Sequence, residues 1–88
     1  MLGYDPWRKS RTERARDVLE SLVDIGGRCL YDTLAERVGI REVPLRQALE
    51  YLNARGYIGC RIRIDRKVVY YVTGLGMSMV DLLQDLET

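Results

Sequence analysis

The chain has 88 residues, of which 47% are hydrophobic and 31% charged, and its formal net charge is +1. This length allows one small domain with a limited core, and the apolar content excludes an intrinsically disordered chain. No apolar run is long enough to cross a bilayer, and the N-terminus lacks the apolar segment of a signal peptide. We therefore expect a cytoplasmic protein without a membrane partner.

Positive charge is concentrated in two segments of the chain. Residues 1–16 carry five Lys or Arg residues against two acids, and residues 41–73 carry seven against three. Residues 17–40 and residues 74–88 each carry three more acids than bases. This segregation is typical of a protein with one surface that contacts a phosphate backbone.

We expect residues 1–11 to form a basic N-terminal arm, because Pro6 argues against a regular helix there. One interpretation is that Trp7, with Tyr4 nearby, packs against the domain or a partner subunit. The other is that the arm lies along DNA. In that case its basic residues contact the DNA backbone: Arg8, Lys9 and Arg11.

Apolar spacing predicts a first helix from about Thr12 to Ile25, with Ser10 or Thr12 as its cap. A glycine pair ends this helix, and residues 28–30 then have the composition of a short strand. Asp32 or the residue beside it is expected to cap a second helix that runs to Val38.

The central segment Arg41–Gly56 follows a tight turn at Gly39. Pro44 suits the first turn of a helix, and Gly56 suits the left-handed position after its end. One apolar stripe is predicted to face the core: Leu45, Ala48, Leu49 and Leu52. Two helices joined by a turn of about three residues form a helix-turn-helix.

After this helix the apolar period changes from 3.6 to 2. Residues 57–64 and 68–73 are predicted to be two strands of a basic hairpin, joined by the polar turn Asp65–Lys67. The turn contains no glycine, so its type does not follow from the sequence.

The last segment, residues 74–88, is predicted to be a helix whose apolar arc is wide. Val80 and Leu83 widen the arc. Such an arc on a terminal helix typically contacts both its own core and a second chain. We therefore expect a homodimer with this interface: Leu75, Met79, Leu82, Leu83 and Leu86.

The run TLAERVGIREVPLRQALEYLNARGYI resembles the helix-turn-helix of winged-helix regulators of the ArsR, MarR and PadR kind. The hairpin RIRIDRKVVYYVT is similar to the basic wing of these proteins, and Thr73 with Gly76 resembles the start of their last helix. The resemblance implies an α+β winged helix-turn-helix fold in residues 12–73. That fold has a three-helix core and a β-hairpin wing, and residues 74–88 add a C-terminal dimerisation helix. It also implies binding of double-stranded DNA as a homodimer.

The chain departs from the pattern of these regulators at two arginines. Arg41 occupies the place where they often have Ser or Thr as the cap of the recognition helix. Arg66 stands where the wing turn often has glycine. The cysteine and histidine ligands of the metal-sensing ArsR branch are absent, so the resemblance does not imply a metal-responsive switch.

The predicted DNA contacts follow from how a recognition helix enters the major groove with its N-terminal half. Arg41, Arg46 and Gln47 are the expected base-reading residues, since arginine pairs with guanine and glutamine with adenine. The wing is expected to contact the DNA backbone or the minor groove through Arg61, Arg63, Arg66 and Lys67. The alternatives are a solvated helix face and a hairpin whose charges prevent edge-to-edge aggregation.

Enzyme activity is not expected, because the chain has no histidine and therefore no Ser–His or Cys–His arrangement. No catalytic residue, metal site or cofactor is predicted. Cys29 and Cys60 lack the spacing of a metal site, and we expect free, partly buried thiols, with a disulfide as the alternative. In winged-helix folds a strand separates these two positions.

We therefore predict a sequence-specific double-stranded DNA-binding protein that regulates transcription as a homodimer. The alternative is a protein-binding winged-helix adaptor in a larger assembly. Glu42 and Glu50 favour that alternative, because acids on the exposed face of the central helix repel phosphates.

Overall fold

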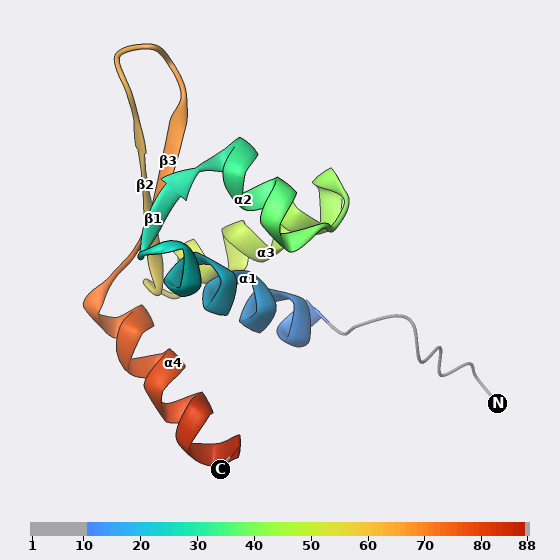
Figure 1. Cartoon of the computed structure of the whole chain (residues 1–88), viewed down its shortest axis with the longest axis vertical. Helices are drawn as coiled ribbons and strands as arrows, with labels where there is room; N and C mark the ends of the chain where they lie inside the picture. Colours follow the sequence, from blue (N-terminus) through green and yellow to red (C-terminus); the bar gives the residue numbers. More distant parts are fainter. Residues whose placement is uncertain (1–10, 88) are drawn as a thin grey trace, which may run out of the picture.

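The structure is a computed structural model and describes residues 11–87 (Figure 1). Seven elements follow one another: α1 (Arg11–Ile25), β1 (Arg28–Leu30), α2 (Tyr31–Val38), α3 (Glu42–Ala54), β2 (Ile58–Ile62), β3 (Val68–Val72) and α4 (Gly74–Glu87). The predicted α+β class and the order of elements are confirmed. Each predicted wing strand is slightly longer than the observed one.

The start of α2 differs from the prediction. Asp32 is not its cap, because β1 runs directly into the helix and Leu30 occupies the cap position in an extended conformation without a side-chain hydrogen bond. Asp32 lies in the first turn instead. Thr12 does not cap α1 either, since that helix already includes Arg11; Ser10 lies outside the described residues.

Glycine and an arginine set the turn between α2 and α3. Gly39 has a φ of 70° and donates its N–H to the carbonyl oxygen of Ala35, which closes α2 in the left-handed manner. Arg41 then caps α3 in an extended conformation, and its side chain makes no cap hydrogen bond. The end of α2 is therefore capped by a backbone N–H, and the start of α3 has no side-chain cap.

The three strands form one antiparallel sheet in the order β1-β3-β2. Tyr70, in the middle strand, is the register partner of Cys29 on one side and of Cys60 on the other. A strand therefore separates the two cysteines, as predicted, and both thiols are free. Cys60 is exposed rather than partly buried, because only the base of the hairpin, at Ile58, is covered by helices.

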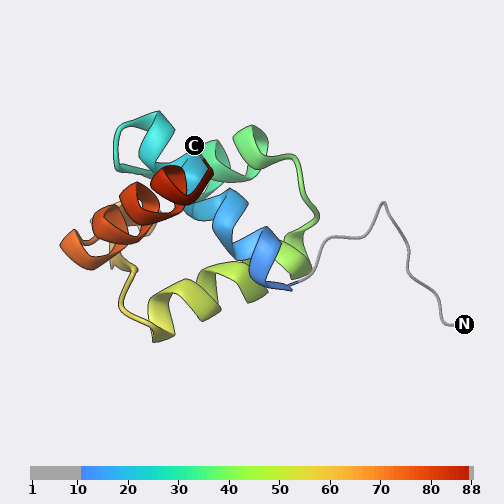
Figure 2. The ribbon, with the colours of Figure 1, turned by 90° about the horizontal axis from the view of Figure 1, so that it is seen from below.

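The core is built around α1, which contacts α2, α3 and α4 and lies between them (Figure 2). The predicted inward stripe of α3 is buried. On the apolar face of α1, Ala15, Val18, Leu19 and Leu22 are buried, whereas Val23 is only partly buried. The buried core comprises Ala15, Val18, Leu19, Leu22, Leu34, Leu45, Ala48, Leu49, Leu52, Ile58 and Val80. Only Val80 comes from α4, so the terminal helix contributes one edge of the core and leaves most of its apolar surface outside it.

One threonine joins the end of α3 to the start of α4. The Thr73 hydroxyl donates to the carbonyl oxygen of Gly56 at 2.6 Å and accepts the N–H of Gly76 at 3.1 Å, so it caps α4 while it contacts the turn after α3. The Thr73 N–H also donates to the carbonyl oxygen of Tyr57 at 3.0 Å. Gly76 allows this close approach, because a Cβ there would collide with the Tyr57 carbonyl oxygen.

Candidate nucleic-acid interface

The outer face of α3 presents a mixed set of side chains. Arg46 and Gln47, which were predicted to read bases, are both exposed on this helix, and Arg41 is exposed at its cap. Two more residues of this helix share the exposed surface: Val43, to which the sequence assigned no role, and Glu50, the acid that favours the adaptor alternative. Val43 is 65% exposed in the first turn, and Glu50 is exposed one turn further along.

Arg46 is already paired within its own helix. Its guanidinium Nη2 lies 2.9 Å from Oε1 of Glu42, one turn earlier, and both side chains are about two-thirds exposed (66% and 65%). Exposed pairs of this kind stabilise a helix by only about 0.3–0.5 kcal/mol, since water screens them. Glu42 therefore orients Arg46, but a binding partner with a better hydrogen-bond acceptor can displace the carboxylate with little loss of free energy.

We define the wing as residues 58–72. The loop at its tip, between β2 and β3, is closed by short backbone hydrogen bonds. The Arg63 N–H donates to the carbonyl oxygen of Lys67 at 2.8 Å, and the Arg66 N–H donates to the carbonyl oxygen of Arg63 at 2.9 Å. Ile64 and Asp65 lie at the centre of this turn, and the φ of Arg66 is 66°. These features make a three-residue hairpin loop that closes on a left-handed residue, where glycine is preferred.

All four predicted wing cations are exposed: Arg61, Arg63, Arg66 and Lys67. Asp65 contacts two of them, since its Oδ2 lies 3.3 Å from Arg63 Nη2 and its Oδ1 accepts the Lys67 N–H at 3.2 Å. The carboxylate thus rigidifies the loop while it neutralises part of its charge. Arg61 lies over the Tyr71 ring, 5.9 Å from its centroid.

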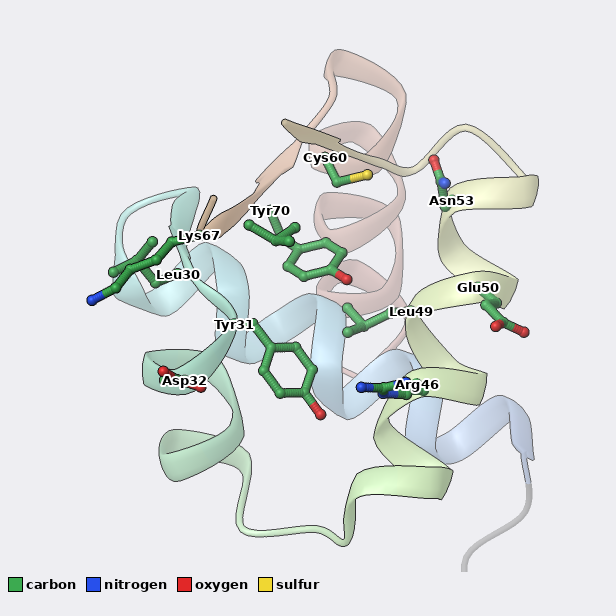
Figure 3. Close-up of a pocket in the computed structure, with 11 residues that line it drawn as sticks. Leu30, Tyr31, Asp32, Arg46, Leu49, Glu50, Asn53, Cys60, Lys67 and Tyr70 are labelled. Carbon is green, nitrogen blue, oxygen red and sulfur yellow. The ribbon is translucent and has the colours of Figure 1, made fainter. Parts of the chain in front are cut away.

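A hollow of about 420 Å³ separates α3 from the wing. Tyr31 and Tyr70 lie within it, with ring centroids 6.3 Å apart and a 50° angle between the ring planes. Figure 3 shows that the Arg46 side chain points from α3 into this space towards Tyr31, whereas the Glu50 carboxylate points away from it. Lys67 lines the wing side of the hollow. The hollow is thus lined by two aromatic rings and by the Arg46 guanidinium, whereas the Lys67 ammonium points away from it.

Burial affects two ionisable groups near this hollow. The pKa of the Cys29 thiol is raised above its ordinary value of 9.0 by burial. The pKa of the Tyr70 hydroxyl is raised above its ordinary value of 10.0, first by burial and then by Cys60 and Tyr31. Both groups are therefore neutral at physiological pH, and neither contributes charge to this surface.

The predicted dimer surface divides into two parts. Leu75, Leu82 and Leu86 are 55%, 53% and 75% exposed, so the described chain leaves more than half of each side chain in this stripe of α4 uncovered. Met79 is only partly available, because it packs against the core, and Leu83 is half-buried. The predicted seam is thus narrower than expected, as the helix also contacts its own domain.

Several predictions fall outside these surfaces or outside the described residues. Arg8 and Lys9 belong to residues 1–10, which the structure does not describe, and Arg11 is the exposed first residue of α1 rather than the end of an arm. Within residues 11–87, no group of three or more His, Cys, Asp or Glu side chains is placed to hold a metal ion. None of the helices in this range is long and apolar enough to cross a membrane.

Three helices, a helix-turn-helix between the second and third, and a hairpin after the third define a winged helix-turn-helix domain with an added C-terminal helix. Comparison with solved structures agrees, and no family profile and no curated protein matches the sequence. The chain is similar to BpsR of Bordetella bronchiseptica, whose DNA binding is regulated by 6-hydroxynicotinic acid. The TM-score is 0.77, the identity is 21%, and the match covers 93% of this chain and 61% of BpsR.

Two smaller proteins match over most of their own length. F93 from STIV, a winged-helix DNA-binding protein, gives a TM-score of 0.77 at 19% identity, with 90% of each chain covered. Sso10a-2, a DNA-binding protein from Sulfolobus solfataricus, gives 0.72 at 19% identity, with 90% of this chain and 78% of that chain covered. At these identities the likeness is one of fold. The chain spans only 49% of a similar MarR-family regulator from Silicibacter pomeroyi.

Proposed function

We propose that this protein is a sequence-specific double-stranded DNA-binding protein that regulates transcription as a homodimer. The observation that carries the proposal is the arrangement of α3 and the wing around one hollow. Arg46 points into the hollow from the recognition helix, and Lys67 lines the hollow on the side of the wing, so each of the two flanking elements contributes a basic residue to this surface. A DNA strand that passes from a major groove occupied by α3 to a minor groove beside the wing would run through this space.

The recognition helix supplies the chemistry for reading bases. Arg46 can form two hydrogen bonds with the O6 and N7 of guanine, and Gln47 can form two with the N6 and N7 of adenine. Arg41, at the cap, lies at the end of α3 that enters the groove first. Glu42 pairs with the Arg46 guanidinium until a base replaces the carboxylate as its acceptor.

The wing supplies affinity through charge. Arg66 supports this role, because an arginine in a left-handed conformation costs about 1–2 kcal/mol relative to glycine. A strained conformation at an exposed, charged position points to function at that position. The three other wing cations extend the same surface, and each phosphate contact releases counterions.

The C-terminal helix supplies the surface through which two copies of the chain associate. Leu75, Leu82 and Leu86 form an exposed stripe, and Asp81 and Asp85 are exposed beside it and keep the rest of the helix soluble. Burial of a leucine contributes about 1.5–3 kcal/mol, so six such residues across a two-fold axis outweigh a typical association cost. Two subunits joined in this way present two recognition helices, so the site is a pseudo-palindrome with half-sites about 34 Å apart or a multiple of that distance.

Selection of bound duplexes from a random pool tests the proposal directly. The expected result is an enriched pseudo-palindrome whose affinity falls steeply with salt, with a slope of log K against log salt of about −0.9 for each phosphate contact. An unenriched pool, or an affinity that does not change with salt, contradicts the proposal.

A protein-binding adaptor is the second candidate, and the exposed face of α3 favours it. Val43 and Glu50 form an apolar and acidic strip on that face, which suits a basic protein surface better than phosphates. Absence of any salt-dependent affinity for mixed-sequence duplex DNA would favour this candidate.

A further inference from the structure

Two isoleucines at the end of the wing have no packing partner within the described chain. Ile64 is fully exposed in the loop, and Ile62, two residues earlier at the end of β2, is 75% exposed. The loop is the part of the wing farthest from the helices, and it lies at the opposite end of the molecule from the last turn of α4 (Figure 1). A dimer formed through α4 therefore leaves both isoleucines uncovered.

The loop that carries Ile64 is held in one conformation. Two backbone hydrogen bonds close it between Arg63 and Lys67, and the Asp65 carboxylate accepts a further backbone N–H and pairs with Arg63. The apolar side chain thus lies on a preorganised support at the outermost point of the hairpin. Little conformational entropy is lost when it enters a binding site.

The surroundings of Ile64 match the minor groove of DNA. Arg63, Arg66 and Lys67 flank it within three residues and provide the charges that attract phosphates on both sides of a groove. An isoleucine among such cations is one of the apolar side chains that proteins insert between base pairs from the minor groove, which partly unstacks and kinks the duplex. Removal of the exposed isoleucine surface from water offsets the unstacking, which is easiest at pyrimidine–purine steps.

We propose that Ile64, supported by Ile62, inserts as a wedge at a base-pair step in the minor groove and bends the duplex. The protein then has an architectural activity in addition to sequence recognition. This inference rests on the proposed function, since the wedge acts only on bound duplex DNA. In a two-fold dimer the two wings produce two kinks, one on each side of the site.

The test measures end-to-end energy transfer in labelled duplexes that carry the selected site, at saturating protein. The natural chain is expected to shorten the end-to-end distance by an amount equivalent to a bend of roughly 20–90°. Ile64→Ser should lose most of this change and keep the same salt slope, because no charge is altered. Ile64→Met, which keeps a long apolar side chain, should retain the bend.

A second readout reports the wedge itself. With 2-aminopurine placed in turn at each pyrimidine–purine step outside the half-sites, the natural chain should raise the fluorescence several-fold at one step, and Ile64→Ser should not. Binding by the natural chain without a bend, or an equal bend with Ile64→Ser, overturns the wedge and leaves the proposed function standing. No binding to any duplex overturns both. Ile64-dependent binding to phosphatidylcholine–phosphatidylglycerol vesicles without any DNA bend also overturns the wedge and identifies a membrane-inserting tip.

Discussion

At the scale of single residues, Arg66 shows how function and stability compete. The loop geometry calls for a residue with positive φ, and glycine meets this need without steric cost. Arg66 adopts a φ of 66° with a full side chain, so the wing carries an additional charge together with local strain. The two effects can be separated because one substitution removes both and another removes only the charge.

Arg66→Gly should raise the free energy of unfolding by about 1 kcal/mol, less the part that glycine's greater freedom in the unfolded chain removes. The same variant should weaken DNA binding and reduce the salt slope by about 0.9. Arg66→Ala is the matched control, since it loses the charge but keeps the strain. Chemical denaturation and DNA titrations at several salt concentrations measure both quantities. Equal stability of the two variants would show that the strain is absent.

Tyr70 and Cys29 predict how stability depends on pH. Burial raises the pKa of both groups above their ordinary values of 10.0 and 9.0, so the folded chain keeps protons that the unfolded chain releases. The free energy of unfolding should therefore be constant near neutral pH and fall as pH rises above about 9. Tyr70→Phe, which keeps the ring without the hydroxyl, should show a shallower fall. A stability that increases between pH 9 and 11 would contradict the assignment.

At the scale of elements, α3 combines a buried stripe with an exposed face that carries both charges. Its apolar spacing is regular, a proline lies in its first turn and a glycine follows its end. The sequence therefore predicts both the helix and the place where it ends. The orientation of Arg46 does not follow in the same way, because it depends on the ion pair with Glu42 and on the position of the wing.

Arg46→Ala should reduce affinity by about 1–3 kcal/mol at sites with the preferred base pair and should relax the preference at that position. Glu42→Ala is its matched control: it frees Arg46 without removing it, so the same preference should remain. Competition binding against duplexes with single base-pair changes measures both variants. A uniform loss across all sequences would place Arg46 on a phosphate instead.

Which features the sequence predicts depends on whether they arise locally. The helices α1 and α3 and the wing strands are predicted correctly, since each has its own apolar period and its own terminating residues. The cap of α2 is predicted wrongly, because β1 passes into the helix without an intervening turn. The hollow and its Tyr31–Tyr70 pair are missed, because they arise only when β3 lies between the other two strands. The sequence shows that the wing turn contains no glycine. It does not predict that Arg66 adopts the left-handed conformation in that turn.

At the scale of the whole molecule, the proposed DNA surface and the proposed dimer surface lie far apart. The wing tip and the last turn of α4 occupy opposite ends of the described chain (Figure 1). Val80 faces the chain's own core, and the stripe of Leu75, Leu82 and Leu86 lies on another side of the same helix. Substitutions at the stripe of α4 therefore leave the DNA-contacting side chains of each subunit in place, and substitutions at the wing tip leave the dimer surface in place.

Leu82→Asp combined with Leu86→Asp should convert dimers to monomers that bind a palindromic site far more weakly but fold normally, since neither residue belongs to the core. Met77→Asp is the control, because it adds a charge to α4 away from this stripe. Sedimentation at tens of micromolar measures the change in mass. A natural chain that sediments as a monomer at that concentration would contradict the dimer and the palindrome together.

The Thr73 joint has a consequence for how the protein measures distance along DNA. This residue bonds the turn after α3 to the first turn of α4, and Gly76 brings α4 against the backbone of Tyr57 without room for adjustment. In the proposed dimer, the angle between each recognition helix and the two-fold axis is then fixed by short hydrogen bonds rather than by a flexible linker. Each base pair added between the half-sites rotates one of them by about a tenth of a turn about the helix axis. A rigid joint does not allow the recognition helices to turn with the displaced half-site. The binding site therefore requires a fixed number of base pairs between its half-sites as well as particular bases within them.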